Sequence, residues 1–510
     1  MLARVAPRLR VALSSEVVPE IREFERTSTT VANVYVQDLA ERYLADLARR
    51  LHELGVRPTP HIMLSHGGIA TVETAGRYPI RILESGPAGG ALAASAFGVR
   101  ARAGERDLLA FDMGGTTAKL CLVANGAPLV THEFEVGREY RLLPGSGLPV
   151  KVPVTDMIEI GVGGGSIARV NALGLLTVGP DSAGSEPGPV CYGRGGTEPT
   201  VTDADLLLGY LDPAYFLGGG MALDVEAARE AVRTKIAEPL GVSVEEAAWG
   251  IHTSVNEDMA NAARVHAVER GKDPAKLPMY TFGGAGPVHG AGVARALGAR
   301  TVVAPPAAGV LSALGFLTAP LAFDFVRSAR AAVLDLSWED VDARFAEMEA
   351  EGAALLRESG VDGADVTHAR VAEMRYAGQG YEIRVPVRAS AESWPDALVA
   401  DFTDVYRSLY RRSGPPVAVE VLNWRVVSSA PVPEVSLRLK EIEPGRASAG
   451  SCPVYFAGGF VDTAVVDRYR LRPGDWGRGP AIVQERESTV VVPPGARCVV
   501  RGDASLEVSW

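Results

Sequence analysis

Apolar positions recur at helical spacing among charged side chains over residues 28–55. Thr29 or Thr30 suits the N-cap of this segment and Gly55 suits its end, so the pattern predicts one long amphipathic helix. Farther along, short apolar runs alternate with helical patterns, which is typical of an α/β fold. These patterns predict a strand at 60–64, a loop at 65–68, and helices at 203–211, 225–238 and 244–271.

Several apolar runs lead directly into glycine-rich turns. Residues 107–126 read as strand, turn and strand, and they end in an Asn-Gly hairpin turn. Residues 83–98, 280–298 and 301–317 each read as a strand, a turn and a helix of small residues. Residues 140–200 are dense in glycine and predict a loop-rich insert. Beyond about residue 324 a helix at 338–359 precedes short β segments, so we expect boundaries near 325 and 435.

Composition and charge narrow the class of protein. The 510 residues predict three to four domains at roughly 150 residues each, and 56 glycines with 34 prolines fit many tight loops. The net charge of −11 argues against a nucleic-acid partner. No apolar run reaches the roughly 18 residues of a membrane span, and no signal peptide is evident, so no membrane partner is expected. The four cysteines are far apart and form no CxxC pair. We expect a soluble, cytoplasmic, multidomain protein.

The most informative segment runs from Phe111 to Lys119, with the sequence FDMGGTTAK. An apolar strand delivers Asp112 to a turn in which Gly114 and Gly115 let a ligand approach the backbone. The N–H groups of such a turn form an anion nest, and a strand-end aspartate can hold Mg²⁺. The segment therefore favours a nucleotide phosphate site, with the hydroxyls of Thr116 and Thr117 as further donors. A plain β-hairpin is the alternative.

Two further glycine segments extend this picture. Gly283, Gly284 and Gly286 precede a helix, where bare backbone and the helix dipole can receive a nucleotide. A tight strand–helix packing turn is the alternative. In the other segment, Asp156 and Glu159 precede a run that contains Gly163, Gly164, Gly165 and Ser166. Further acids follow, among them Asp203 and Asp205. So many acids among small residues favour a metal or polar-substrate site over a solvated loop.

Histidine and cysteine add weaker candidates. His66 and His289 lie beside glycines at predicted strand ends, where either could contact nucleotide or substrate. A structural role is the alternative for both. His252 and His266 lie too far apart on one helix to form a local metal pair. Cys191 has no neighbouring base, which favours a buried structural thiol over a nucleophile.

Together these segments resemble the hydantoinase A/5-oxoprolinase/acetone carboxylase family over nearly the whole chain. The matching stretches are SHGGIATVETAGRYPIRILESGPAGG, FDMGGTTAKLCLV, IEIGVGGGSIARV, VGPDSAGSEPGPVCYGRGGTEPTVTDADLLLGYLD, TFGGAGPVHGAGVARALG, MRYAGQGYEIRVPV and AIVQERESTVVVPP. The resemblance implies an actin-like ATPase fold of the acetate and sugar kinase/Hsp70/actin type, with a β-rich α+β C-terminal domain. It implies a linker at 1–27, the second ATPase lobe at 28–324 with its insert at 140–200, and the C-terminal domain at 325–510.

The resemblance also implies the chemistry. Family members use ATP to phosphorylate a carbonyl or enolate oxygen, which opens a cyclic amide or drives carboxylation of a ketone. The implied cofactors are ATP and Mg²⁺, with a second divalent metal. The implied partners are a small cyclic amide and a hydantoinase B-type subunit. Asp112, Lys119 and Glu159 become the catalytic candidates, and the glycines and threonines named above become the nucleotide site. Gly163–Ser166, His66 and His289 become the substrate candidates, and Asp112, Asp156, Glu159, Asp203 and Asp205 the metal candidates.

Two departures from the family pattern give alternatives. The chain opens at what resembles the linker into the second lobe, and no other Asp-x-Gly-Gly-Thr loop occurs. We therefore expect weak ATP binding by this chain alone and a separate chain that supplies the N-terminal lobe, or else a non-catalytic assembly subunit. Lys119 and Glu159 replace the acid and the histidine of many relatives. Lys119 could therefore contact phosphate or pair with an acid. The favoured function is an ATP-dependent cyclic-amide hydrolase subunit, and a ketone carboxylase subunit is the competing hypothesis.

Overall fold

The computed structural model describes residues 10–101, 105–137, 145–412, 414–431 and 448–510. The chain folds into two compact units, and each is built from three separate segments. The first unit contains residues 1–85, 130–154 and 319–434, and the second contains residues 86–129, 155–318 and 435–510. The expected linear division at 325 therefore differs from the compact units, because residues after 435 return to the second unit.

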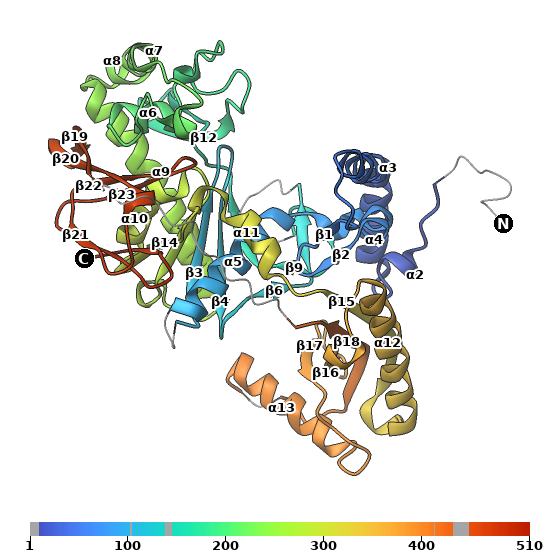
Figure 1. The fold of residues 1–510 in the computed structure, drawn as a ribbon. Coiled ribbons are helices and arrows are strands. Elements are labelled where there is room, and N and C mark those ends of the chain that lie inside the picture. Colours follow the sequence, from blue (N-terminus) through green and yellow to red (C-terminus); the bar gives the residue numbers. More distant parts are fainter. Residues whose placement is uncertain (1–9, 102–104, 138–144, 413, 432–447) are drawn as a thin grey trace. The chain divides into compact units, whose positions relative to one another are not determined.

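A mixed sheet forms the centre of the second unit (Figure 1). Its middle strands β3, β13 and β14 are parallel, and the other pairs are antiparallel. In spatial order the strands are β10 (Met157–Ile160), β4 (Ala118–Ala124), β3 (Leu108–Met113), β13 (Met279–Phe282), β14 (Thr301–Ala304), β25 (Leu506–Ser509), β24 (Arg497–Val500) and β21 (Trp476–Arg478), and β5 (Ala127–Pro128) pairs with β4.

Alternating side chains of β3 enter two different cores. Leu109, Phe111 and Met113 pack into the core that contains helices α6, α7, α9 and α10, whereas Leu108 and Ala110 face α5 and α11. The sheet is therefore apolar on both faces and covered by helices on both, as parallel sheets are. The bounds are α5 (Ser85–Ala101), α6 (Val201–Leu207), α7 (Val225–Val232), α9 (Val244–Glu269), α10 (Gly286–Leu297) and α11 (Leu311–Thr318).

Two smaller β elements complete the second unit. The hairpin of β11 (Ser166–Val170) and β12 (Leu176–Ser182) follows β10. A four-stranded sheet near the chain end has the order β19 (Ser448–Phe456), β20 (Gly459–Asp467), β22 (Ala481–Gln484) and β23 (Thr489–Val492). Val454, Ile482 and Val490 of this sheet join the core of α9 and α10.

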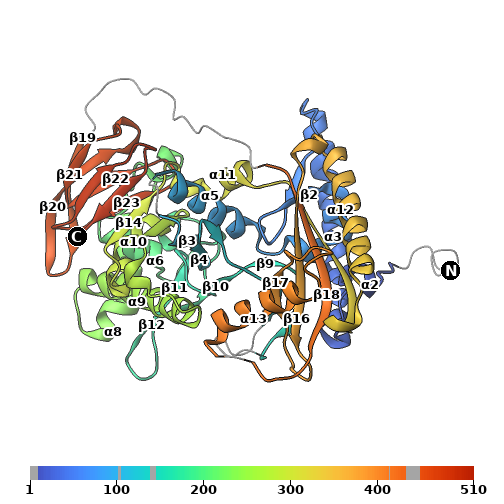
Figure 2. The same cartoon turned by 90° about the horizontal axis from the view of Figure 1, so that it is seen from below.

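The first unit contains an antiparallel sheet of four strands (Figure 2). Its order is β15 (Ala322–Ala332), β18 (Val419–Ser429), β16 (Thr367–Tyr376) and β17 (Ile383–Pro386), and helices α12 (Trp338–Glu358) and α13 (Asp396–Tyr410) pack on it. The aromatic side chains of Phe345, Phe402 and Trp424 are fully buried in this core. The unit also contains α2 (Ser14–Val17), α3 (Glu23–Glu53), α4 (Val72–Arg77), β1 (His61–Met63), β2 (Ile69–Thr71), β7 (Phe134–Val136) and β8 (Leu148–Val150).

Most of the predicted elements are present. The long N-terminal helix is α3, and the strands and helices predicted at 107–126, 280–298 and 301–317 are confirmed. The segment at 83–98 differs, because no strand precedes its helix and its glycines lie inside α5. A Cβ at Gly90 would lie 2.3 Å from the Phe282 ring, so small residues here let α5 approach β13 closely. The predicted helix at 225–238 continues beyond α7 as a π-helical turn at 233–237 and α8 (Glu238–Leu240).

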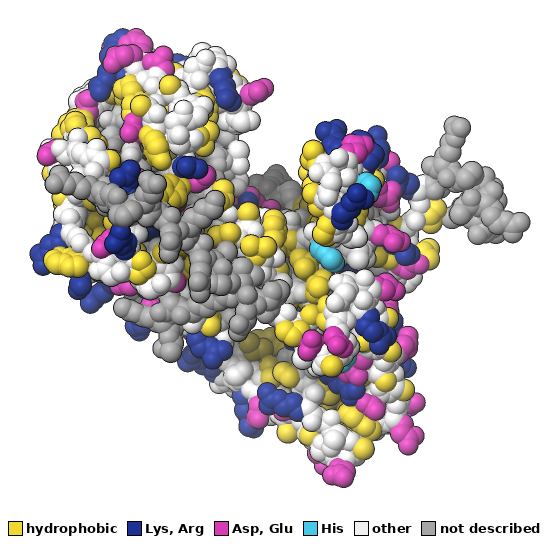
Figure 3. Space-filling view, in the orientation of Figure 1, with side chains coloured by type: hydrophobic (Ala, Val, Ile, Leu, Met, Phe, Trp, Pro, Cys, Tyr) yellow, Lys and Arg dark blue, Asp and Glu magenta, His cyan; other side chains and the backbone are white. Residues whose placement is uncertain are grey.

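The glycine-rich insert is more regular than a run of loops. Its described part, from residue 145 onward, includes β10 on the edge of the central sheet and the β11–β12 hairpin. The first residues of the insert lie outside the described part, as do residues 1–9 of the expected linker. Over the described part of the visible face, acidic and basic side chains are interspersed (Figure 3). No helix among the described residues has the length and apolar character to cross a membrane.

Candidate active site

The β3–β4 hairpin presents a turn of bare backbone. The register places Asp112 opposite Lys119, and the Gly114 N–H donates to the Thr117 carbonyl at 3.1 Å. A Cβ at Gly114 or Gly115 would meet no atom within 4 Å, and Gly115 and Thr116 are exposed. The Gly114 N–H is therefore occupied within the turn, whereas the Gly115 N–H on its open side can face an anion.

Asp112 occupies the end of β3, where the strand leaves the core. Burial raises the pKa of its carboxyl to about 6, against a smaller lowering effect of the Lys119 ammonium. No hydrogen bond or ion pair joins the Asp112 side chain to another residue in the described part of the chain. A largely buried carboxylate without a partner is suited to bind a cation that arrives with a ligand.

The turn that follows β13 packs directly against this hairpin. Gly283 has a φ of +84°, and a Cβ on it would lie 2.4 Å from Asp112 Oδ1. The Ala285 N–H donates to the Met113 carbonyl at 3.0 Å, and α10 then begins at Gly286. The absence of side chains on this turn thus brings the N-terminus of α10 close to the β3–β4 hairpin.

The glycine segment after β10 contacts the other side of the same turn. The Gly164 N–H donates to the Gly114 carbonyl at 3.0 Å, and the Gly165 N–H donates to the Gly115 carbonyl at 2.6 Å. A Cβ on Gly163 would lie 2.7 Å from the Thr116 nitrogen. The Gly163 N–H donates to the Ser166 hydroxyl at 2.9 Å. Three glycine segments from distant parts of the sequence therefore meet backbone to backbone.

A cavity of about 150 Å³ opens where these segments meet. The hairpin and the two other turns contribute backbone, Thr202 and Asp205 contribute polar side chains, and Tyr192, Tyr215 and Phe216 contribute an aromatic wall. Its volume suits phosphate groups rather than a whole nucleotide, since drug-sized ligand pockets are usually about 300–1,000 Å³. The remaining lining residues include Gly284, Arg486 and Glu487.

Two of the acids predicted as metal ligands, Glu159 and Asp156, are paired with basic side chains. Lys119 Nζ lies 2.9 Å from Glu159 Oε1, across the β4–β10 pair, and donates to Thr117 Oγ1 at 3.0 Å. Arg270 Nη2 donates to Asp156 Oδ1 at 2.6 Å. Charged partners occupy Glu159 and Asp156, so an ion would have to compete with an arginine or a lysine there.

Asp203 is the N3 residue of a capping box at the start of α6. Its carboxylate accepts hydrogen bonds from the N–H and hydroxyl of Thr200, both at 2.8 Å, and from the N–H groups of Val190 and Cys191. These bonds occupy both of its oxygens. Asp203 therefore fixes local structure, and its carboxylate is occupied by the backbone and Thr200 rather than open to a metal ion.

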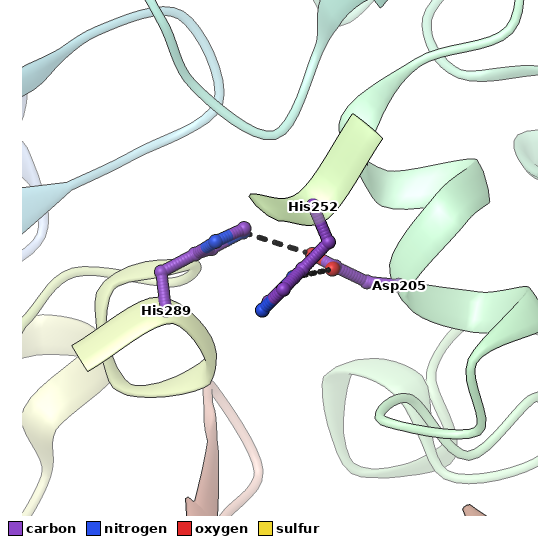
Figure 4. Close-up of side chains that lie close together, drawn as sticks. All are labelled: Asp205, His252 and His289. Atoms are coloured by element: carbon purple, nitrogen blue, oxygen red, sulfur yellow. Dashed lines mark hydrogen bonds and ion pairs between the residues drawn. The ribbon is translucent and has the colours of Figure 1, made fainter. Parts of the chain in front are cut away.

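Asp205 lies two residues after Asp203 in α6, and its carboxylate contacts two buried histidines (Figure 4). Asp205 Oδ1 lies 2.8 Å from Nδ1 of His252, and Oδ2 lies 3.1 Å from Nε2 of His289. Nδ1 of His289 lies 2.8 Å from Oδ1 of Asn256. The contacts with both imidazoles outweigh the cost of burial and lower the pKa of Asp205 to about 2, whereas burial lowers the pKa of His252.

The remaining candidates lie elsewhere. His66 belongs to the first unit, where it lines a cavity of about 510 Å³ together with Arg81, Asp324 and Arg425. Burial lowers the pKa of His66. Cys191 is fully buried, and burial raises the pKa of its thiol far above the usual range, which favours the structural role.

The sequence pattern did not identify His252 or Asn256 as site residues. Asp205 lies 47 positions before His252 and 84 positions before His289 along the chain, and it contacts both. A local spacing rule has no signal for contacts between three helices. Arg486 and Glu487 of the cavity come from the β-rich C-terminal segment, far from the glycine turns in the sequence.

Comparison with known proteins adds an independent finding. The hydantoinase/oxoprolinase model matches residues 26–325, and the model for the hydantoinase/oxoprolinase C-terminal domain matches residues 328–504. The chain is 39% identical over 500 residues to an uncharacterized protein of Methanocaldococcus jannaschii, which covers 97% of this chain and 72% of that protein. It is 33% identical over 525 residues to the caprolactamase subunit alpha of Pseudomonas jessenii, which covers 100% of this chain and 73% of that protein.

Solved structures agree with these matches. The crystal structure of ATP-dependent caprolactamase from Pseudomonas jessenii superposes with a TM-score of 0.78 at 33% identity, covering 100% of this chain and 74% of that chain. The nucleotide-free structure of acetone carboxylase superposes with a TM-score of 0.81 at 26% identity, covering 99% of this chain and 72% of that chain. Both comparisons support a mixed α/β architecture over the length of the chain.

Proposed function

The chain belongs to the hydantoinase/oxoprolinase family, which confirms the resemblance seen in its motifs, and we propose that it is the ATP-binding subunit of an enzyme that hydrolyses cyclic amides. The observation that carries the proposal is the meeting of three glycine turns at one cavity beside the unpartnered carboxylate of Asp112. Relatives that are ATP-dependent support the use of ATP, and the caprolactamase relative supports an amide substrate.

The bare backbone of the hairpin fits a phosphate group. Because neither Gly114 nor Gly115 has a side chain and a Cβ at either would point into open space, phosphate oxygens can approach the Gly115 N–H without steric hindrance. Gly284 lines the same cavity, and the N-terminus of α10 begins next to it, so this side would receive the rest of the nucleotide. We assign this unit as the second lobe of an actin-like ATPase.

Asp112 would hold Mg²⁺, which supplies charge neutralisation for the transferred phosphoryl group when it is bound. The carboxylate fits this role because no hydrogen bond or ion pair from a described residue holds it, and the nearby Lys119 ammonium is bonded to Glu159 and Thr117. Lys119 is different, since its ammonium is paired with Glu159 and Thr117. We therefore propose that Lys119 and Glu159 position the hairpin, and that Asp112 is the catalytic residue.

The chemistry follows from the poor reactivity of an amide. The amide oxygen attacks the γ-phosphorus of ATP, the bond to the β,γ-bridging oxygen breaks, and ADP departs. Water then adds to the activated carbon, and the ring C–N bond breaks with a proton taken up by nitrogen, which leaves an acyl phosphate. A second water hydrolyses the acyl phosphate to a carboxylate and free phosphate. The protein accelerates such a transfer by positioning the groups and stabilising charge.

The activity would require a second type of chain. Relatives of known activity include caprolactamase subunit alpha, acetone carboxylase beta subunit and acetophenone carboxylase gamma subunit, so this family supplies subunits of larger enzymes. We propose a hydantoinase B-type partner, which would complete the site for the cyclic amide.

The test is a two-part measurement on the protein combined with its B-type partner. Calorimetry with MgATP compares the wild type with Asp112→Ala, and product analysis follows opening of lactams, hydantoins and 5-oxoproline. The proposal expects saturable binding and ring opening coupled to ADP release, with both lost in the variant. Ring opening that continues unchanged in Asp112→Ala would remove Asp112 from the mechanism.

The similarity to acetone carboxylase favours one competing function, carboxylation of a ketone. The same protein preparation separates the two functions, because carboxylation requires bicarbonate and a ketone whereas ring opening requires neither. Product formed only with bicarbonate and a ketone would replace the hydrolase proposal.

A further inference from the structure

Asp205, His252 and His289 form a buried cluster at the junction of three helices. Asp205 comes from α6, His252 from α9 and His289 from α10, and their side chains are 4%, 6% and 0% exposed. One ligand atom of each residue lies within 4.8 Å of the others. Figure 4 shows the carboxylate of Asp205 in contact with both imidazole rings.

The hydrogen-bond pattern around His289 favours a cation at this cluster. Nδ1 of His289 faces Oδ1 of Asn256 at 2.8 Å, and with the amide in this orientation Nδ1 is the nitrogen that carries the hydrogen. Nε2 then presents a lone pair to Asp205 Oδ2 at 3.1 Å, and two acceptors face each other. A proton or a metal ion between them removes the repulsion.

The surroundings resemble those of a metal site. Asn256 is buried, and its contact with Nδ1 orients His289, as a carbonyl group behind a metal-bound histidine does. Tyr210 and Trp249 pack against the ring of His252, with ring centroids 5.1 and 5.8 Å away, so an apolar wall shields the cluster. Two imidazoles and one carboxylate form a donor set used by zinc and non-haem iron.

We propose that Asp205, His252 and His289 bind one divalent transition-metal ion. Two imidazole ligands favour ions of the zinc, iron or cobalt type over Mg²⁺, which prefers oxygen ligands. Asp205 also lines the cavity at the glycine turns, so this ion lies at the wall of that cavity. The inference does not depend on the proposed function, because metal binding can be measured without ATP or an amide.

The first test is metal content after purification without chelators or affinity metals. Elemental analysis of the wild type should find one transition-metal ion per chain, whereas Asp205→Asn, His252→Gln and His289→Gln should each lose it. His266→Gln is the matched control, because His266 is buried on the same helix as His252 but belongs to no such cluster among the described residues. This control should retain the metal, and circular dichroism checks that every variant is folded.

The second test needs no ligand variant and uses the apo protein with Co²⁺ alone. Binding should produce visible d–d absorption of a nitrogen- and oxygen-ligated ion, and Zn²⁺ should displace it. Asn256→Ala should weaken Co²⁺ binding about 10- to 100-fold, because the variant loses the group that orients the His289 ring. This graded loss does not require removal of a ligand.

Two results would overturn the proposal. One is wild-type protein that is folded, contains no stoichiometric metal and takes up neither Co²⁺ nor Zn²⁺. The cluster would then hold a proton, and ¹⁵N spectra of labelled histidine would show His289 protonated on both nitrogens. The other is metal that the three ligand variants retain as well as the control does, since the ion would then lie elsewhere.

Discussion

Gly283 leaves no room for a side chain beside Asp112. A Cβ at this position would lie 2.4 Å from Asp112 Oδ1 and 2.5 Å from the Met113 carbonyl. The backbone of Gly283 also has a φ of +84°, which residues with a side chain adopt at a cost. The position of Asp112 thus depends on the absence of a side chain at Gly283, 171 residues later in the sequence.

We expect Gly283→Ala to destabilise the protein by about 1–3 kcal/mol and to weaken MgATP binding, because strain and overlap would displace the Asp112 carboxylate. Urea denaturation and calorimetry measure the two effects. The control is Gly284→Ala, since the nearest atom to a Cβ there is the Glu487 carbonyl at 3.8 Å. Equal loss of stability in both variants would contradict the steric explanation.

Asp112→Asn should stabilise the protein at neutral pH. The folded state raises the pKa of Asp112 from 3.8 to about 6, so the folded state holds this proton more tightly than the unfolded state. Burial of this carboxyl therefore costs the wild type no stability below pH 3.8. The loss of unfolding free energy grows between pH 3.8 and about 6, and it is complete above about pH 6. The gain in the variant should vanish near pH 4 and reach at most about 3 kcal/mol above pH 6.

Denaturation of both proteins at several pH values, without nucleotide, measures this gain. A gain that is constant with pH would show that ionisation of Asp112 is not its cause. MgATP binding by the wild type should also weaken below pH 6, where the carboxylate becomes protonated.

The Lys119–Glu159 pair should contribute little to stability. Lys119 is 16% exposed, but Glu159 is 49% exposed, and exposed ion pairs are worth about 0–1 kcal/mol. A double-mutant cycle with Lys119→Gln and Glu159→Gln measures their coupling by urea denaturation. If the pair only positions the hairpin, both single variants and the double variant should reduce ATP turnover similarly. A much larger loss in Lys119→Gln than in Glu159→Gln would instead indicate direct contact of Lys119 with phosphate.

Asp203→Asn should cost about 2–4 kcal/mol, because an amide nitrogen cannot accept the hydrogen bonds that reach both carboxylate oxygens. Thermal and urea denaturation measure this loss. Asp224 provides the matched control, since its side chain caps α7 through one bond from the Ala227 N–H and asparagine caps equally well. Asp224→Asn should change stability by less than about 0.5 kcal/mol. A similar small change in Asp203→Asn would show that the buried cap is not essential.

Local patterns predicted the parts of the site that lie close together in sequence. The strand, turn and strand around Asp112 could be predicted because β3 and β4 are joined by a short glycine turn. The strand–turn–helix at Gly283 was predictable for the same reason. The strand and turn expected before the helix of residues 83–98 are absent, because Gly90 lies inside α5 and serves close packing against Phe282.

Contacts between distant segments had no such signal. β25 pairs with β14, so the central sheet contains strands from the region that was expected to form a separate β-rich domain. The contacts of His252 and His289 with Asp205 also arise only when α6, α9 and α10 pack together. Helix periodicity shows that a histidine can be buried, but it does not show which carboxylate it will meet.

The shared hydrogen bonds of the glycine turns determine how their amide hydrogens exchange with deuterium. The N–H groups of Gly164, Gly165 and Ala285 all donate to carbonyls of the hairpin segment 113–115. None of these three amides can exchange from its closed state unless its turn separates from that segment. We expect these amides to lose their protection from deuterium exchange together, as one opening unit, although 121 residues separate Gly164 from Ala285 in the sequence.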